Sequence, residues 1–343
     1  MNTISRRAFL QCTAAGALAA YARTVPPQEP EMKPVDIEHR TFGKTGLRVA
    51  VLGFGGSEIG YERTDEATVA RLLNAALDAG LNVVDTAECY INSEEQIARA
   101  IGHRRKEYNL FTKVGHWIPD GKDPSWGWSK EGVLASIERS LKRLQTDTVE
   151  LVQIHSCDLE TLKRGECIEG LLEAQKQGKT RFIGYSGDRE AALHAVKLDV
   201  FQALQTSVNI ADQQGIDLFL PIAQEKNMGV IAKRPIANAA WRYDATPTEG
   251  YHVEYWKRLQ KLKYPFATGD ARKTPGPNGP VGTALRFTLQ QPGVHVAIVG
   301  TSKPERWSEN AALTRPGPLP HDQHQAIRDR WKEVAPPDWV GMT

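Results

Sequence analysis

Four polar residues at the ends of apolar runs carry side chains that suit proton transfer. Asp85 ends the run NVVD, Lys113 stands near the end of LFTKV, and His155 ends LVQIH. Tyr90 follows five residues after Asp85, in DTAECY. A buried carboxylate is unfavourable unless a cation or hydrogen-bond donors compensate it. We therefore expect Asp85 to pair with Lys113, provided that their strands are neighbours.

These residue types predict acid–base chemistry at a carbonyl oxygen. A free tyrosine has a pKa of about 10 and is a poor acid at neutral pH. A nearby cation favours the phenolate, so we expect Lys113 to lower the pKa of Tyr90 towards the range useful for proton donation. His155 can then orient the carbonyl by hydrogen bonding. Each residue alone also fits an ordinary structural role; their order on consecutive strand ends favours the catalytic interpretation.

The elements that position these residues alternate between strands and helices. Helical spacing of apolar residues, as in DEATVARLLNAALDAG and KEGVLASIERSLKRL, separates the extended runs. Eight strand–helix units predict an α/β fold, the closed (β/α)8 TIM barrel, whose active site lies at the C-terminal ends of the strands. An open doubly wound sheet is the alternative. The predicted strands are residues 51–54, 82–85, 109–114, 149–155, 181–185, 203–208, 229–232 and 296–299.

Segments outside this alternation complete the predicted domain. Two short extended runs flank the sequence GKTG at residues 43–46 and predict an N-terminal β-hairpin. Long loops at the C-terminal face are expected at residues 116–129 and 236–280. Trp117 in the first loop is expected to form a wall of the substrate pocket, or else to pack beneath the loop.

The first residues have the features of an export signal. Residues 1–22 contain the pair Arg6 and Arg7, a weakly apolar stretch and the ending Ala-Tyr-Ala. This pattern predicts a twin-arginine-type signal peptide, and a disordered basic tail is the alternative. Residues 23–37 are then a linker and residues 38–343 the barrel domain. We accordingly expect export by the twin-arginine machinery to the periplasm of a bacterium.

Composition excludes several classes of function. The 343 residues are 41% hydrophobic and carry a formal charge of +2, so a nucleic-acid partner is not expected. No run of eighteen apolar residues indicates a membrane span. Cys12 lies in the predicted signal, and the remaining cysteines (Cys89, Cys157 and Cys167) are expected to be free thiols. His155, Cys157 and Asp158 lack a second ligand cluster, so no metal site is expected.

Six segments together resemble the aldo-keto reductase superfamily over about residues 38–315. They are FGKTGLRVAVLGFGG, DTAECY, FTKVG, LKRLQTDTVELVQIH, FIGYSG and AIVGTSKPERWSENAAL. The resemblance implies a barrel oxidoreductase in which a nicotinamide delivers hydride to a carbonyl carbon. It assigns the catalytic tetrad to Asp85, Tyr90, Lys113 and His155, with Tyr90 protonating the carbonyl oxygen.

The resemblance also implies a cofactor site, with two departures from the family pattern. Gly187 stands where the family has an asparagine, with Asp188 adjacent, and Lys233 stands where it usually has an aromatic residue. Arg306 matches a residue that binds the 2′-phosphate, which favours NADP(H) over NAD(H). The implied cofactor-binding residues are Gly55, Gly56, Ser186, Gln205, Lys233, Arg234, Gly300, Thr301, Ser302, Arg306, Glu309 and Asn310.

The sequence therefore predicts an NADP(H)-dependent enzyme that interconverts a carbonyl compound and an alcohol. The first alternative is a slow nucleotide-binding protein or redox sensor, which the departures at Gly187 and Lys233 favour. The second alternative is an enzyme that keeps its cofactor tightly bound and performs internal redox chemistry on a sugar. Both alternatives use the same barrel and the same cofactor site.

Overall fold

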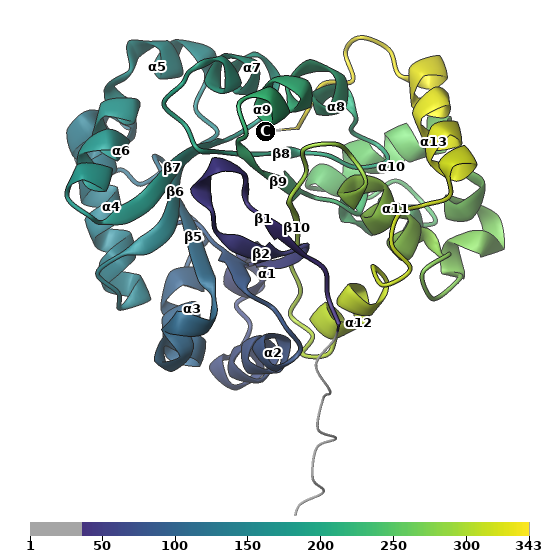
Figure 1. Cartoon of the computed structure of the whole chain (residues 1–343), viewed down its shortest axis with the longest axis horizontal. Coiled ribbons are helices and arrows are strands. Elements are labelled where there is room, and N and C mark those ends of the chain that lie inside the picture. Colours follow the sequence, from purple (N-terminus) through teal and green to yellow (C-terminus); the bar gives the residue numbers. More distant parts are fainter. Residues whose placement is uncertain (1–35, 343) are drawn as a thin grey trace, which may run out of the picture. The chain divides into compact units, whose positions relative to one another are not determined.

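The structure, a computed structural model, describes residues 36–342, and its centre is a closed barrel of eight parallel strands (Figure 1). The predicted signal at residues 1–22 and the linker up to residue 35 lie outside the described residues. The TIM-barrel prediction is confirmed, and every predicted strand falls within one residue of an observed one. The strands are β3 (Leu52–Gly55), β4 (Val83–Asp85), β5 (Asn109–Val114), β6 (Val149–His155), β7 (Thr180–Ser186), β8 (Ala203–Ser207), β9 (Gly229–Lys233) and β10 (Val296–Val299).

The strand register brings the polar strand ends to one mouth of the barrel. Asp85 on β4 pairs with Gly55 on β3, and β4 also pairs with β5, which carries Lys113. His155 on β6 pairs with Ser186 on β7, which in turn pairs with Gln205 on β8. Because all eight strands are parallel, these C-terminal ends share one face of the barrel.

The predicted N-terminal hairpin is also confirmed, and it closes the opposite end of the barrel. Strands β1 (His39–Thr41) and β2 (Arg48–Ala50) pair antiparallel and lie across the barrel in Figure 1. The hairpin's Phe42 is fully buried, and its ring stacks on Phe111 of β5 at 5.6 Å between centroids. The hairpin and the strands fill this end of the barrel with apolar side chains. Access to the interior is therefore from the C-terminal face.

Helices surround the barrel as the apolar spacing predicted. Asp65, Ser129 and Asp158 cap helices by accepting a hydrogen bond from the third residue beyond them, at 2.9, 3.0 and 2.7 Å. The helices are α1 (Ser57–Tyr61), α2 (Glu66–Asp78), α3 (Ser93–Ile101), α4 (Lys130–Leu144), α5 (Leu159–Arg164), α6 (Glu166–Lys176), α7 (Arg189–Lys197), α8 (Gln214–Leu218), α9 (Leu220–Glu225), α10 (Tyr251–Leu262), α11 (Pro280–Leu289), α12 (Arg306–Ala312) and α13 (His321–Val334).

The segment at 236–280 differs from the long loop that was predicted, because α10 forms within it. Tyr255 and Leu259 of α10 pack with Trp331 of α13 and with Trp339 in a second apolar core. The charged residues between these apolar positions obscured the helical pattern in the sequence. As a result, the chain after α13 returns to the barrel mouth instead of ending in solvent.

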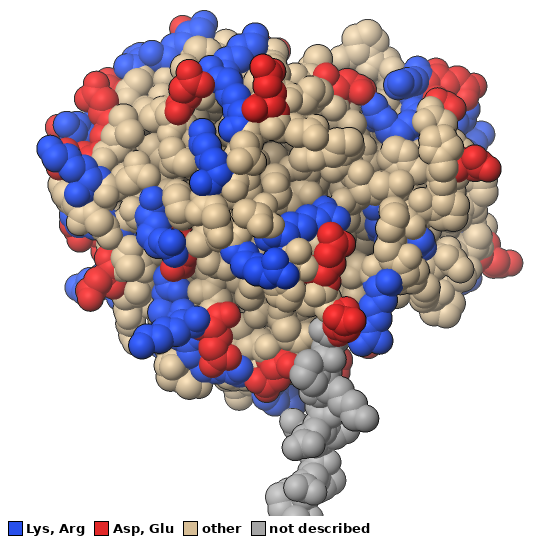
Figure 2. Space-filling view, viewed as in Figure 1, with Lys and Arg blue, Asp and Glu red and all other residues tan. Residues whose placement is uncertain are grey.

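The described surface mixes charges of both signs. Figure 2 shows basic and acidic side chains interspersed on the face that carries the hairpin. Among the described residues, no helix combines the length and the apolar character needed to cross a bilayer.

Candidate active site

A buried ion pair lies at the centre of the barrel mouth. Lys113 and Asp85 are almost completely excluded from solvent, and the ammonium donates to Asp85 Oδ1 and to the backbone oxygen of Thr86, at 2.8 Å in the second case. Burial raises the pKa of Asp85, and the adjacent ammonium works against that rise. The predicted pairing of neighbouring strands β4 and β5 is confirmed.

The second oxygen of Asp85 organises the cofactor residues that the sequence suggested. Gln205 Nε2 donates to Asp85 Oδ2 at 2.8 Å, and Gln153 Nε2 lies 3.4 Å from the same oxygen. Ser186 Oγ in turn donates to Gln205 Oε1 at 3.1 Å. One carboxylate therefore fixes side chains from β5, β6 and β8, with β7 attached through Ser186.

The phenol of Tyr90 lies above this pair, but its pKa differs from the prediction. Lys113 Nζ is 5.1 Å from the centre of the Tyr90 ring. Burial raises the pKa of Tyr90 well above its usual value, and the charge of Asp85 adds to the rise, whereas Arg234 lowers it. The expected lowering by Lys113 is therefore wrong for the protein alone, because loss of solvation outweighs a cation already neutralised by Asp85. The phenol therefore keeps its proton at neutral pH and can act as a proton donor.

His155 is held as a neutral ring beside Tyr90. Burial, followed by the charges of Lys113 and other neighbouring cations, lowers the pKa of His155 well below its usual value. Its ring makes an edge contact with Tyr90 at 5.7 Å and with His116 at 4.9 Å. The Sγ atom of Cys89 lies 3.4 Å from Nδ1 of His155. A neutral imidazole here can donate one hydrogen bond and accept another.

Three residues that directly follow site residues have left-handed backbone conformations. Ile91 follows Tyr90, Ser156 follows His155, and Arg234 follows Lys233, with φ of 52°, 62° and 54°. Such conformations are unfavourable for residues other than glycine, above all for β-branched isoleucine. Backbone strain of this kind clusters at functional sites, where the surrounding packing must hold it.

A cavity of about 1080 Å³ connects the ion pair to the loop after β10. This volume exceeds that of an ordinary small-molecule pocket, about 300–1,000 Å³. Of the predicted site residues, all line the cavity except Glu309, Lys113 and Trp117. The predicted residues lining it are Gly55, Gly56, Asp85, Tyr90, His155, Ser186, Gln205, Lys233, Arg234, Gly300, Thr301, Ser302, Arg306 and Asn310.

The loop after β10 forms the far end of the cavity. Thr301 Oγ1 accepts from the backbone N–H of Lys303 at 3.0 Å, which shapes the turn before α12. Arg306 pairs with Glu309 at 3.3 Å and is about half exposed, so its guanidinium remains accessible from solvent. A side chain at Gly300 would collide with the carboxylate of Glu58, which therefore lies directly against this loop.

Lys233 stands at one of the two positions where the family pattern fails, and it pairs with Asp188, the residue that follows Gly187 at the other. Lys233 Nζ lies 2.9 Å from Asp188 Oδ2, and burial lowers the pKa of Lys233 to about 8. Asp188 Oδ1 also accepts from Thr206 Oγ1 at 2.7 Å and from the Ser207 N–H at 2.8 Å. Asp188 thus holds Lys233 at the barrel mouth and does not replace the missing asparagine.

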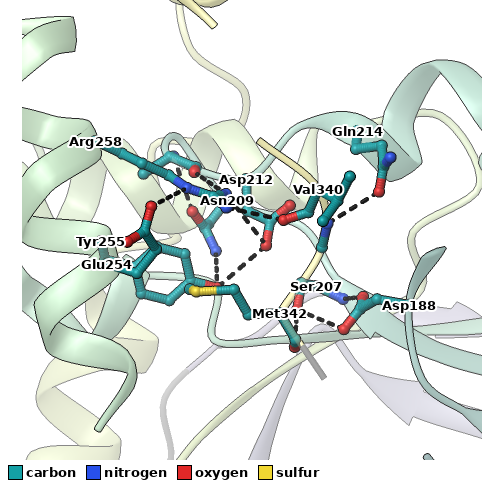
Figure 3. Close-up of polar contacts among 12 residues, drawn as sticks. Asp188, Ser207, Asn209, Asp212, Gln214, Glu254, Tyr255, Arg258, Val340 and Met342 are labelled. Carbon is teal, nitrogen blue, oxygen red and sulfur yellow. Dashed lines mark hydrogen bonds and ion pairs between the residues drawn. The ribbon is translucent and has the colours of Figure 1, made fainter. Parts of the chain in front are cut away.

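The C-terminal segment, with Val340 and Met342, lies beside Arg258 and Ser207 (Figure 3). It also anchors Arg234, the neighbour of Lys233 in the chain. Arg234 donates to the backbone oxygen of Met342 and to Ser207 Oγ, the latter at 2.9 Å. Its guanidinium lies over the Tyr251 ring, 3.6 Å from the centroid. Arg258 of α10 holds the same segment by donating to the backbone oxygen of Val340 at 2.9 Å. The last described residues thus hold Arg234, a residue of the cavity wall, in place, which the sequence did not indicate.

Trp117 does not form a wall of the cavity, so of the two predicted placements the structure agrees with packing under the loop, and His116 lines the cavity instead. The Trp117 indole packs on Arg139, 4.3 Å from ring centre to guanidinium. Glu88 causes this arrangement, because its Oε1 accepts the backbone N–H groups of Gly115, His116 and Trp117 at 2.7, 2.9 and 3.0 Å. A buried acid next to Cys89 in DTAECY was the signal that sequence reasoning missed.

Comparison with known proteins agrees with this geometry. The model of the aldo/keto reductase family matches residues 51–332, which include the whole barrel. The chain belongs to the aldo/keto reductase family.

Several relatives resemble this aldo/keto reductase over most of their length. An uncharacterized oxidoreductase, YqkF of Bacillus subtilis, is 28% identical over 86% of this chain and 96% of its own. L-galactose dehydrogenase of Arabidopsis thaliana is 29% identical over 84% and 91%. A putative voltage-gated potassium channel subunit beta of Schizosaccharomyces pombe is 26% identical over 81% and 88%. The holo form of an aldo-keto reductase from Bacillus halodurans superposes with a TM-score of 0.73 at 26% identity, covering 88% of this chain and 99% of that one.

The Glu88 contacts predict that its removal loosens the loop at residues 115–117. In Glu88→Ala the three backbone N–H groups and Arg139 lose a buried acceptor. The free energy of unfolding should therefore fall by about 3–5 kcal/mol. We expect the loop amides to exchange with deuterium at least about tenfold faster, since their opening no longer breaks these bonds. Glu94→Ala is the control, because Glu94 is equally buried but bonds to Thr112 and Arg143. Equal loop exchange in the two variants would contradict this role for Glu88.

Proposed function

We propose that this aldo/keto reductase reduces a carbonyl compound to an alcohol with NADPH, and catalyses the reverse reaction with NADP. The observation that carries the proposal is the convergence of a protonated phenol, a neutral imidazole and a buried ion pair at one end of a long cavity. Aldo/keto reductases and oxidoreductases among the relatives support a nicotinamide-dependent carbonyl reduction in general. NADP as the cofactor rests on the match of Arg306 to the family pattern and on its place at the cavity. Tyr90 as the acid rests on the geometry of this chain.

The cavity fits a dinucleotide along its length. Gly55 and Gly56 border it at β3, and no side chain there narrows it. Arg306 and Lys303 offer cationic groups for phosphate near the loop after β10. At the other end, Ser186 and Gln205 present polar groups beside Asp85. When bound there, the nicotinamide would supply a hydride to the carbonyl carbon.

Residues of this chain would protonate and orient the carbonyl oxygen. The hydroxyl of Tyr90 makes no hydrogen bond to any described side chain, so it is available to donate a proton to the substrate. His155, held neutral, can donate a hydrogen bond to the same oxygen and orient it. Lys113 stays fixed below the Tyr90 ring by Asp85, and its charge favours the phenolate left after proton transfer.

A second candidate, a nucleotide-binding protein with slow turnover, is favoured by the pairing of Lys233 with Asp188. That ion pair occupies the position where an aromatic ring was expected to stack on the nicotinamide. Potassium channel beta subunits among the relatives show that the family includes proteins named for another role. Measured binding without measurable carbonyl reduction would favour this candidate.

We further propose that the chain is exported through its arginine pair, Arg6 and Arg7. Replacing both arginines by lysine in the full chain should leave the protein in the cytoplasmic fraction of the bacterial host, because twin-arginine recognition depends on the pair. Fractionation followed by immunoblotting measures this. Periplasmic recovery equal to that of the unaltered chain would refute the proposal.

Tyr90→Phe tests the proton donor. The substitution removes only the hydroxyl, so the turnover number should fall at least about 100-fold, the range expected for a lost general acid. The dissociation constant for NADPH should change less than about threefold, because the hydroxyl makes no hydrogen bond to a described side chain. Tyr61→Phe is the matched control, since its ring lies 5.7 Å from that of Tyr90 and also faces the cavity. Unchanged turnover in Tyr90→Phe would exclude the assigned role.

Arg306→Ala tests cofactor preference. If its guanidinium binds the 2′-phosphate, the dissociation constant for NADPH should rise about tenfold while that for NADH stays nearly constant. Fluorescence titration of the two cofactors measures both constants. Arg315→Ala is the control, because Arg315 is exposed and does not line the cavity. Equal weakening of NADPH and NADH would show that Arg306 does not read the 2′-phosphate.

A further inference from the structure

The thiol of Cys89 contacts the functional imidazole directly. Its Sγ atom is 3.4 Å from Nδ1 of His155, and both residues line the cavity beside Tyr90. Among the described residues, no other side chain hydrogen-bonds to the His155 ring. Tyr90 and His116 meet the ring only through edge contacts. Within the described part of the chain, the thiol is therefore the side chain placed to hydrogen-bond to this ring.

The protonation states of both groups give this contact a direction. Burial raises the pKa of the Cys89 thiol to about 11, so the sulfur keeps its hydrogen at neutral pH. Burial and the cations Lys113, Lys233 and Arg234, together with His116, lower the pKa of His155, so its ring is neutral with one N–H. The thiol S–H is a weak donor and its sulfur a weak acceptor, so the unprotonated imidazole nitrogen is the stronger acceptor of the pair. The favoured arrangement is S–H donating to Nδ1.

We propose that Cys89 is a positioning residue, whose S–H···Nδ1 hydrogen bond holds the His155 proton on Nε2. The proposal rests on the carbonyl-reducing function above, for which Nε2–H must face a substrate oxygen. In the other tautomer Nδ1–H would point at the sulfur, and the lone pair of Nε2 would repel the oxygen of a carbonyl. The thiol thus prevents the unproductive tautomer through its hydrogen bond to the ring.

The first test reads the tautomer itself, by ¹⁵N NMR of the histidine-labelled protein at neutral pH, with His155→Gln used to assign the signals. The unaltered protein should show His155 as the Nε2–H tautomer. Cys89→Ser should keep this tautomer, because a hydroxyl can donate to the same nitrogen. Cys89→Ala should show a substantial population of the Nδ1–H tautomer. An unchanged Nε2–H signal in Cys89→Ala would overturn the proposal.

The second test is turnover with a carbonyl substrate and NADPH. Cys89→Ala should lower the turnover number about tenfold or more, because orientation of the general acid–base machinery is lost. The dissociation constant for NADPH should stay within about threefold, and Cys89→Ser should restore most of the rate. Cys167→Ala is the control, since this buried thiol of α6 does not line the cavity. Equal rates in Cys89→Ala and the unaltered protein would overturn the proposal.

The two tests also separate this inference from the proposed function. The NMR signal belongs to the protein without substrate, so a shift of tautomer in Cys89→Ala supports the positioning role whatever the reaction. If that shift occurs and no variant reduces any carbonyl, the proposed function fails and the positioning role stands. If carbonyls are reduced and the tautomer does not respond to Cys89, the positioning role fails alone.

Discussion

The buried ion pair between Asp85 and Lys113 constrains the whole barrel mouth. Both side chains are almost fully removed from water, and such a pair is tolerated only when the remaining polar atoms are satisfied. Gln205, Gln153 and the Thr86 carbonyl supply those partners. Since the partners come from different strands, the requirement to satisfy one carboxylate fixes the relative positions of the residues to which we assign catalysis and cofactor binding.

Desolvation, more than charge, sets the resting state of the site. It keeps the Tyr90 phenol and the Cys89 thiol protonated, and it keeps the His155 ring neutral. The hydrogen-bond donors of the site therefore carry their protons before substrate binds. Lys113 contributes less by lowering the phenol pKa in advance than by placing a fixed positive charge where negative charge would develop, which is how preorganised electrostatics lowers a barrier.

The sequence was sufficient for features that depend on local pattern. The alternation of strand and helix patterns predicted the barrel. The polar residues at the strand ends predicted the grouping of Asp85, Lys113 and His155. Three features depend on contacts between distant segments and were not predictable: the binding of the 115–117 amides by Glu88, the pairing of Lys233 with Asp188, and the return of Met342 to Arg234. The return of Met342 to Arg234 depends on α10, and the charged residues between the apolar positions of α10 hid its helical pattern in the sequence. Trp117 was predicted as a wall of the pocket because the sequence does not show which loop residue faces the cavity. The fold shows that this residue is His116.

Transfer of hydride from NADPH to a carbonyl is tested most directly by a single-turnover experiment with NADPH that carries deuterium on both positions of C4. The protein would be loaded with this cofactor and mixed with an activated aromatic aldehyde and with several aliphatic aldehydes and ketones. Mass spectrometry of the alcohols would then locate the label. Hydride transfer at this site should place one deuterium on the carbinol carbon of at least one product, at a rate that depends on Tyr90. Tight cofactor binding with no label in any alcohol would contradict it.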